Sequence, residues 1–316
     1  MSELPLPALE GTNPLGFLAA LGVLDSMARA GRDATLRWTD ELVPHALIGG
    51  TDDLDELVGI LDRDRSCWAD SLVLGFPGHS PLPDAKPRDS LLRSWYESML
   101  EAPDRNADAD LLCAIVAEGA FDRNGNAKPT HLHFTAGQQK FLEMVRTLAA
   151  NVNRKLLKDA IRGPWAYDSS LPSLSWDARG ERVYAVRATN PSNDKRLGVP
   201  GADWLAFCGL VFYPVSVVNG SLHTTACDVE WKRSAFRWPL WSALATRNVV
   251  WSLVADETLV AHGATLRSRD LAARGVLSVL ESPIRRSDQG GYGSFGGPET
   301  LAASRQSLGM AGDNAH

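Results

Sequence analysis

Apolar residues in the first part of the chain repeat at helical spacing. In residues 14–30, Pro14 can occupy the first helical turn, and the positions that follow are apolar on nearly every side until Asp25. A helix without a polar face is expected to be buried. The other elements predicted in this part are a strand at 34–38 and helices at 51–61, 89–100 and 107–119.

After residue 130 the pattern mixes helices and strands. Residues 138–162 repeat as one long amphipathic helix. The other elements predicted here are a short helix at 204–210 and strands at 182–188, 211–218 and around 221–233. Because helices and strands do not alternate regularly, we predict an α+β fold with mainly antiparallel strands rather than a doubly wound sheet.

Two octapeptides are similar to each other: FLAALGVL (17–24) and WLAFCGLV (204–211). The glycines at matched positions, Gly22 and Gly209, would let a neighbouring element approach each helix closely. The similarity arises either from an internal duplication, which would give two related halves, or by coincidence.

Charge is divided unevenly along the chain. Residues 1–130 hold 22 acidic and 11 basic residues, whereas residues 131–316 hold 16 acidic and 21 basic residues and seven of the ten Trp. The turn-rich segment 121–130 is the best candidate boundary. We therefore predict an acidic, mainly helical domain at 1–130 that docks on protein, a basic, aromatic-rich α+β domain at 131–300, and a polar tail at 301–316. Chance variation in surface charge is the alternative.

Cysteine usage and hydropathy indicate a cytoplasmic location. The four cysteines are far apart and form no CxxC motif, so buried free thiols are expected. The opening segment MSELPLPALEGTNP lacks the basic and apolar regions of a secretory signal. No apolar run is long enough for a membrane span.

A glycine-rich segment, RRSDQGGYGSFGG (285–297), contains the spacing GxGxxG. Only 20 residues follow Gly296, too few for the rest of a dinucleotide-binding unit, so that function is excluded. A nucleic-acid contact is the functional alternative to a surface loop. Its candidate residues are Arg285 and Arg286 for charge, Gln289 for a base edge, and Tyr292 and Phe295 for stacking.

The last turns of the predicted helix 138–162 supply further positive charge. Arg154, Lys155 and Lys158 are suited to the negative end of the helix dipole. We include them among the candidate nucleic-acid contacts.

Enzyme signatures are scarce. His131 and His133 would lie on the same side of a strand, as in some metal sites, but no third ligand follows at a recognised spacing. Two hydrogen-bonded histidines are favoured over a metal-dependent nuclease or hydrolase that uses this pair. No catalytic residue, metal or cofactor is assigned.

The segment GTNPLGFLAALGVL (11–24), followed by LRW (36–38), resembles the opening of type I-G (formerly I-U) CRISPR-associated proteins of the large-subunit-like and accessory families. The most similar family is the accessory one described as an extension of the helicase–nuclease subunit. Other matching stretches are HFTAGQQ (133–139), GPW (163–165), PSLSW (172–176), NPS (190–192), PGADW (200–204) and DQGGYGSF (288–295).

This resemblance implies an accessory or effector-associated subunit of a crRNA-guided antiviral system that targets DNA. Its partners would be other effector subunits or the helicase–nuclease, with crRNA or target DNA as further candidates. The net charge of −6 differs from the positive charge expected of a protein that binds crRNA on its own, and it favours docking on protein. A purely structural interaction protein is a third alternative.

Overall fold

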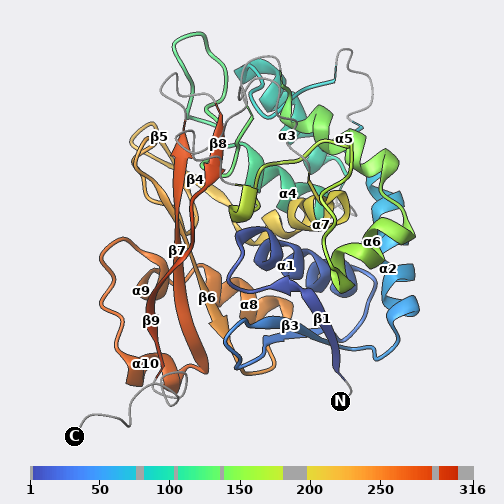
Figure 1. The fold of residues 1–316 in the computed structure, drawn as a ribbon. Coiled ribbons are helices and arrows are strands. Elements are labelled where there is room, and N and C mark those ends of the chain that lie inside the picture. Colours follow the sequence, from blue (N-terminus) through green and yellow to red (C-terminus); the bar gives the residue numbers. More distant parts are fainter. Residues whose placement is uncertain are drawn as a thin grey trace, which may run out of the picture.

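Helices and antiparallel strands follow one another irregularly, so the predicted α+β class is confirmed. The computed structural model describes residues 3–75, 82–102, 106–135, 139–180, 198–286 and 292–304. Within them, helices α1 and α7 lie at the centre, between the sheet that contains β6, β7 and β9 and the helices α2, α5 and α6 (Figure 1).

Every strand pairing in the described residues is antiparallel. One sheet has the order β1-β3-β2 and a second pairs β4 with β5. In the third, β7 pairs with β6, β8 and β9. The strands are β1 (Glu3–Glu10), β2 (Thr35–Trp38), β3 (His45–Gly49), β4 (Val215–Val218), β5 (Ser221–Thr224), β6 (Ala235–Trp241), β7 (Val276–Arg286), β8 (Gly293–Phe295) and β9 (Glu299–Ala303).

Seven of the ten α-helices in the described residues lie before residue 210. The ten are α1 (Pro14–Arg29), α2 (Leu54–Cys67), α3 (Asp89–Leu100), α4 (Asn106–Ile115), α5 (Phe141–Asn151), α6 (Arg154–Arg162), α7 (Pro200–Gly209), α8 (Arg247–Val254), α9 (Glu257–Val260) and α10 (Ser268–Ala273). The short 3₁₀ segments are Trp68–Asp70, Ala178–Gly180 and Leu210–Phe212.

Helix α1 is the buried helix that the sequence predicts. Asn13 caps it by accepting a hydrogen bond from the Leu15 amide, and Pro14 begins the first turn. Every residue from Pro14 to Met27 is buried, including Leu21. The absence of a polar face in the sequence therefore corresponds to burial on all sides.

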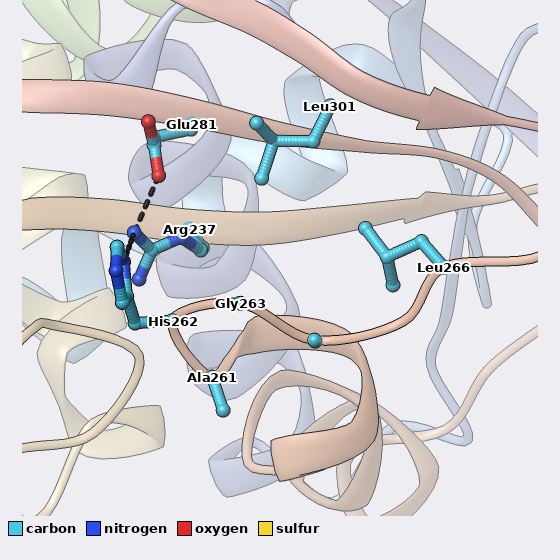
Figure 2. Close-up of a pocket in the computed structure, with 8 residues that line it drawn as sticks. Arg237, Ala261, His262, Gly263, Leu266, Glu281 and Leu301 are labelled. Carbon is cyan, nitrogen blue, oxygen red and sulfur yellow. Dashed lines mark hydrogen bonds and ion pairs between the residues drawn. The ribbon is translucent and has the colours of Figure 1, made fainter.

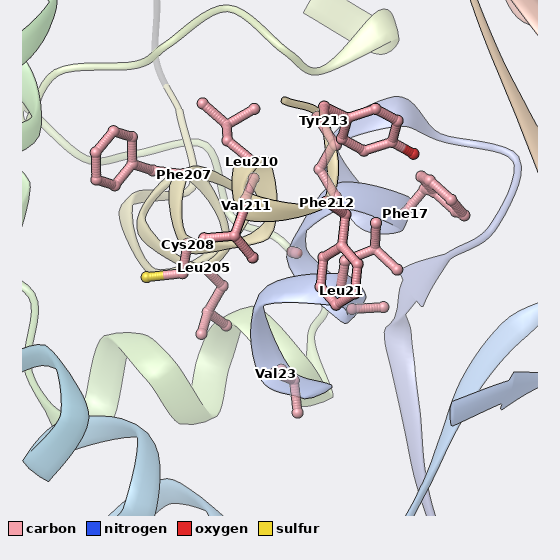
Figure 3. Close-up of a cluster of buried hydrophobic side chains, with 14 of the residues drawn as sticks. Phe17, Leu21, Val23, Leu205, Phe207, Cys208, Leu210, Val211, Phe212 and Tyr213 are labelled. Carbon is pink, nitrogen blue, oxygen red and sulfur yellow. The ribbon is translucent and has the colours of Figure 1, made fainter. Parts of the chain in front are cut away.

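The two matched glycines meet where α1 crosses α7, in the core shown in Figure 3. A Cβ atom on Gly22 would lie 1.8 Å from the carbonyl oxygen of Leu205, and one on Gly209 would lie 2.2 Å from that of Leu18. The two helix backbones are therefore in direct contact. The predicted close packing at both glycines is confirmed.

Aromatic residues connect α1 to the sheets. The Phe17 ring stacks on Trp38 at 5.6 Å and lies 5.8 Å from the Trp238 ring. The indole of Trp238 donates to the Gly11 carbonyl at 2.8 Å. Residues from both 1–130 and 131–300 thus contribute to one hydrophobic cluster, and the division between these ranges stays a prediction.

The single long helix predicted at 138–162 is wrong. The chain leaves the helical conformation at Val152, and a new helix, α6, begins at Arg154. The side chain of Asn153 accepts a hydrogen bond from the Leu156 amide at 3.1 Å. Asparagine in a helix-capping position favours this restart, which hydrophobic periodicity alone does not reveal.

Three other predicted segments differ from the structure or extend beyond the described residues. The strand predicted at 211–218 begins only at Val215, because Leu210–Phe212 forms a 3₁₀ turn that continues α7. The strand predicted at 182–188 lies outside the described residues. Strand β9 extends three residues into the range predicted as a polar tail, and residues 305–316 are not described.

The thiols are free, but they are not all buried. Cys208 is buried and Cys227 is half-buried, whereas Cys67 and Cys113 are exposed. The expectation of buried thiols is therefore wrong for the last two. None of the helices in the described ranges combines the length and apolar character needed to cross a membrane.

A buried acid lies in the first turn of α7. The side chain of Asp203 is completely buried, and its Oδ1 accepts a hydrogen bond from the Leu174 amide at 3.1 Å. Its Oδ2 has no hydrogen-bond partner among the described residues. Burial raises the pKa of Asp203 to about 8, and the nearby Asp177 contributes in the same direction.

Substituting either crossing glycine by alanine should destabilise the fold. Gly22→Ala and Gly209→Ala should each lower the free energy of unfolding by about 1–3 kcal/mol, because the new methyl group meets a backbone carbonyl that cannot rotate away. Urea denaturation measures the change. The matched control is Gly59→Ala in α2, where a Cβ would lie 3.5 Å from arginine side-chain nitrogens. It should be neutral or stabilise by up to ~1 kcal/mol, and equal midpoints for Gly22→Ala and Gly59→Ala would contradict the packing role.

Asp203→Asn should remove a pH dependence of stability. The folded-state pKa of about 8 lies above the unfolded value near 4, so the folded state retains the proton that the unfolded state loses. The stability that proton retention by Asp203 adds to the folded state is complete below pH 4. It is lost as pH rises toward 8, by at most about 1.4 kcal/mol per pH unit. Denaturation at pH 4.5 and 8 should show that the free energy of unfolding of the variant, relative to that of the wild type, is higher at pH 8 than at pH 4.5. A constant difference between the two proteins would refute this.

Candidate nucleic-acid interface

The hairpin of β7 and β8 positions the two predicted arginines. Arg285 pairs with Ser294 and Arg286 pairs with Gly293 across the strands. Successive strand residues point to opposite faces, so Arg285 is exposed while Arg286 turns inward and is half-buried. Residues 287–291 between the strands, including the predicted Gln289, lie outside the described residues.

Gly293 makes room for the inward arginine. A Cβ at this position would lie 2.4 Å from Cδ1 of Phe134 and 3.2 Å from Nη1 of Arg286. The glycine-rich composition of this segment therefore has a packing reason at this position. It allows an aromatic ring and a guanidinium group to lie against the strand backbone.

Arg286 is held by two carbonyl groups and two aromatic rings. Its Nη2 donates to the His131 carbonyl at 2.8 Å and its Nη1 donates to the His133 carbonyl at 3.2 Å. The guanidinium carbon lies 3.6 Å from the centroid of the Trp231 ring and 5.6 Å from that of Phe134. These contacts fix the plane of the guanidinium group.

The charge of Arg286 is not neutralised within the described part of the chain. Burial lowers its pKa to about 10, and no described carboxylate forms an ion pair with it. Its Nε and the Nε2 of His131 are both buried without a described hydrogen-bond partner. A half-buried cation without an ion-pair partner is costly, and an anion nearby would stabilise it.

Lys86 is a second cation near Arg286, and Asp84 and Asp122 also lie close enough to Lys86 to affect its pKa. Lys86 is exposed and close enough to lower the pKa of His133. Burial is the main cause that lowers the pKa of His131 to about 4 and that of His133 to about 3, and Arg286 contributes to both. Both histidines are therefore neutral near pH 7, and the charge resides on Arg286 and Lys86.

Trp231 belongs to this site, although the sequence reasoning missed it. It lies on the connection between β5 and β6, next to the exposed Lys232 and Arg233. An aromatic residue followed by two basic residues is typical of a surface that both stacks on bases and attracts phosphates. That WKR run was the signal available in the sequence. We call Lys86, Trp231, Lys232, Arg233 and Arg286 the basic–aromatic site.

The two aromatic candidates of the C-terminal segment have different surroundings. Tyr292 is 43% exposed beside the β7–β8 hairpin. Phe295 is completely buried, and its ring packs 4.9 Å from Phe134 and 5.5 Å from Phe236. The structure therefore places Phe295 in the core, where a base cannot stack on it, and leaves Tyr292 accessible.

The candidates on α6 lie away from the basic–aromatic site. Helix α6 is on the opposite side of the molecule from the β7–β8 hairpin (Figure 1). Lys155 pairs with Asp159 at 2.7 Å, and Lys158 pairs with Asp55 at 2.9 Å. Arg154 donates to the Asp55 carbonyl at 3.3 Å. These cations are thus engaged with nearby acceptors and do not extend the site.

The two histidines face different partners and do not lie on a strand. Nδ1 of His131 lies 3.1 Å from the Thr224 hydroxyl, and Nε2 of His133 lies 3.2 Å from that of Thr135. In the described ranges, no group of three His, Cys, Asp or Glu residues could hold a metal ion. The interpretation as hydrogen-bonded histidines matches these contacts.

No protein-family model matches the chain, and no curated protein matches it significantly.

The two histidines should remain neutral well below pH 6.5. Their folded-state pKa values lie below the unfolded value, so the stability they contribute is present above pH 6.5 and is lost as pH falls toward 4. An NMR titration of the ring C–H resonances should show no midpoint between pH 5 and 8. A midpoint near 6.5, as in a histidine peptide titrated alongside, would contradict the burial of these rings beside Arg286.

Proposed function

We propose that this chain is a non-enzymatic accessory subunit of a type I CRISPR-Cas effector assembly, and that it binds nucleic acid through the basic–aromatic site. The observation that carries the binding proposal is Arg286, a half-buried guanidinium group without a described carboxylate partner. The membership in an antiviral effector rests on the sequence resemblance.

The chemistry of the site suits a phosphodiester. A phosphate oxygen accepts hydrogen bonds and carries the negative charge that would balance the positive charge of Arg286. The guanidinium group of arginine is well matched in shape to such an anion. Lys86, Lys232 and Arg233 would add attraction along the backbone. Tyr292 offers a partly exposed ring on which a base could stack.

The acidic first part of the chain supports the other half of the proposal. A surface rich in carboxylates repels nucleic acid, so residues 1–130, apart from Lys86 at the basic–aromatic site, would dock on another effector subunit or on the helicase–nuclease. Such an assembly would place the protein in the cytoplasm. The basic–aromatic site would then face the crRNA or the target DNA.

Binding of labelled RNA and DNA oligonucleotides, followed by fluorescence anisotropy, tests the site. Affinity should fall steeply with salt, and replacing Arg285 and Arg286 together by Ala should flatten that dependence by roughly 0.7–0.9 in log K per log salt for each lost phosphate contact. Tyr292→Ala should lower affinity by about 1–3 kcal/mol with little change in the salt dependence, because stacking carries no charge.

Arg269→Ala on α10 is the matched control, since it removes an arginine that is 77% exposed on another part of the surface. Its binding curve should match that of the wild type. Because loss of Arg286 removes contacts to two carbonyls, thermal melting of every variant is measured as well. Absence of binding by the wild type, or unchanged curves for a folded double-arginine variant, would reject the proposal.

A further inference from the structure

A second site lies beside the middle of β7, where Glu281 pairs with Arg237 of β6. A pocket of about 410 Å³, partly open to solvent, is lined by residues of β6, β7, β9 and the loop 261–266 (Figure 2). Its polar wall consists of Arg237, Glu281 and His262, and its apolar wall contains Leu266 and Leu301. Figure 2 shows the three polar side chains together at one end, Leu266 at the other end and Leu301 between them, which suits a ligand with a charged head and an apolar body.

The arginine in the polar wall is fully occupied by acids. Nη1 and Nη2 of Arg237 lie 2.6 Å and 3.2 Å from the carboxylate oxygens of Asp228, and Nη2 lies 2.5 Å from Oε2 of Glu281. Its side chain is only 4% exposed. Two carboxylates therefore surround one buried guanidinium group, and an anionic ligand would meet more negative than positive charge.

The strand register adds a third acid to the same row. Arg237 pairs with Glu281 across β6 and β7, and Glu281 pairs with Glu299 across β7 and β9. Directly paired residues project from the same face of a sheet, so Glu299 lies next to Glu281, which lines the pocket. Like charges in this arrangement are destabilising unless a cation compensates them. Arg237 is shared between Asp228 and Glu281, so one guanidinium group compensates only part of the negative charge beside the pocket.

His262 lies at the mouth of the pocket, and its side chain is 82% exposed. Its Nδ1 is 3.2 Å from Nη2 of Arg237 and 3.7 Å from Oδ1 of Asp228. The three carboxylates of Asp228, Glu281 and Glu299 outnumber the one guanidinium group of Arg237, so this group of residues has an excess of negative charge.

We propose that this pocket binds an alkylammonium group, with the ammonium at Glu281 and Glu299 and the alkyl chain between Leu266 and Leu301. Such a group occurs in free amines and at the end of a lysine side chain. A compact ammonium ion with three donors can contact both glutamates without displacing Arg237 from Asp228. The site shares no residue with the basic–aromatic site and is independent of the proposed function.

Titration with n-butylammonium chloride, followed by amide shifts of Gly263 and Leu266 in NMR spectra of the full chain, tests this assignment. Saturable shifts are expected at low salt and should weaken as salt rises. Glu281→Gln should weaken binding by about tenfold, and Glu299→Gln should weaken it by a smaller factor. Glu143→Gln on α5 is the matched control, because this glutamate is 67% exposed and lies on the opposite side of the molecule, and it should bind as the wild type does (Figure 1).

Two further ligands distinguish the sources of the ammonium group. Tighter binding of 1,5-diaminopentane indicates a free amine, whereas tighter binding of Nα-acetyl-lysine methylamide indicates a lysine side chain of a partner. The Nε-acetylated form of the latter should not bind, since its charge is gone. Glu299 is exposed, so Glu299→Gln remains informative if Glu281→Gln loses stability. No shifts with n-butylammonium, equal binding of the acetylated ligand, or unchanged affinity in both folded variants would overturn the proposal.

Discussion

The contact on which the rest of the structure depends is the crossing of α1 and α7 at Gly22 and Gly209. Both helices are buried along their whole contact length, so neither has a solvent-exposed face there. Because no Cβ separates them, their backbones meet, and aromatic side chains such as Phe17 and Phe212 pack around the pair (Figure 3). Sheets and outer helices then cover this pair (Figure 1). Residues nearly two hundred positions apart thus share one core.

The crossing is also reciprocal. Gly22 faces the carbonyl of Leu205, and Gly209 faces that of Leu18, while the octapeptide alignment matches Leu18 with Leu205 and Gly22 with Gly209. Exchanging the two segments therefore reproduces the same contacts, which is the property of a two-fold symmetric interface. A duplicated helix packed against its own copy would give this arrangement. Coincidental similarity of two buried helices would not require matched positions to meet.

The sequence predicted α1, β2 and the close contacts of both glycines, because local periodicity and small residues determine them. It did not predict the helix break at Asn153, where one capping side chain outweighs a continuous apolar pattern. It named Arg286 but not its environment, since the His131 and His133 carbonyls and the Trp231 ring come from two other segments. Phe295 was predicted at the surface because strand alternation could not be assigned through a glycine-rich segment.

The two sites are connected through one loop and one strand. The loop between β5 and β6 brings Trp231 to Arg286 and Asp228 to Arg237, and β7 carries both Glu281 and Arg286. Asp228 is close enough to His131 to oppose the lowering of its pKa, yet both its oxygens are hydrogen-bonded to Arg237. Burial raises the pKa of Cys227, so this neighbour of Arg286 stays a neutral thiol. The carboxylate of Asp228 is thus engaged by Arg237, and within the described ranges no carboxylate is paired with Arg286.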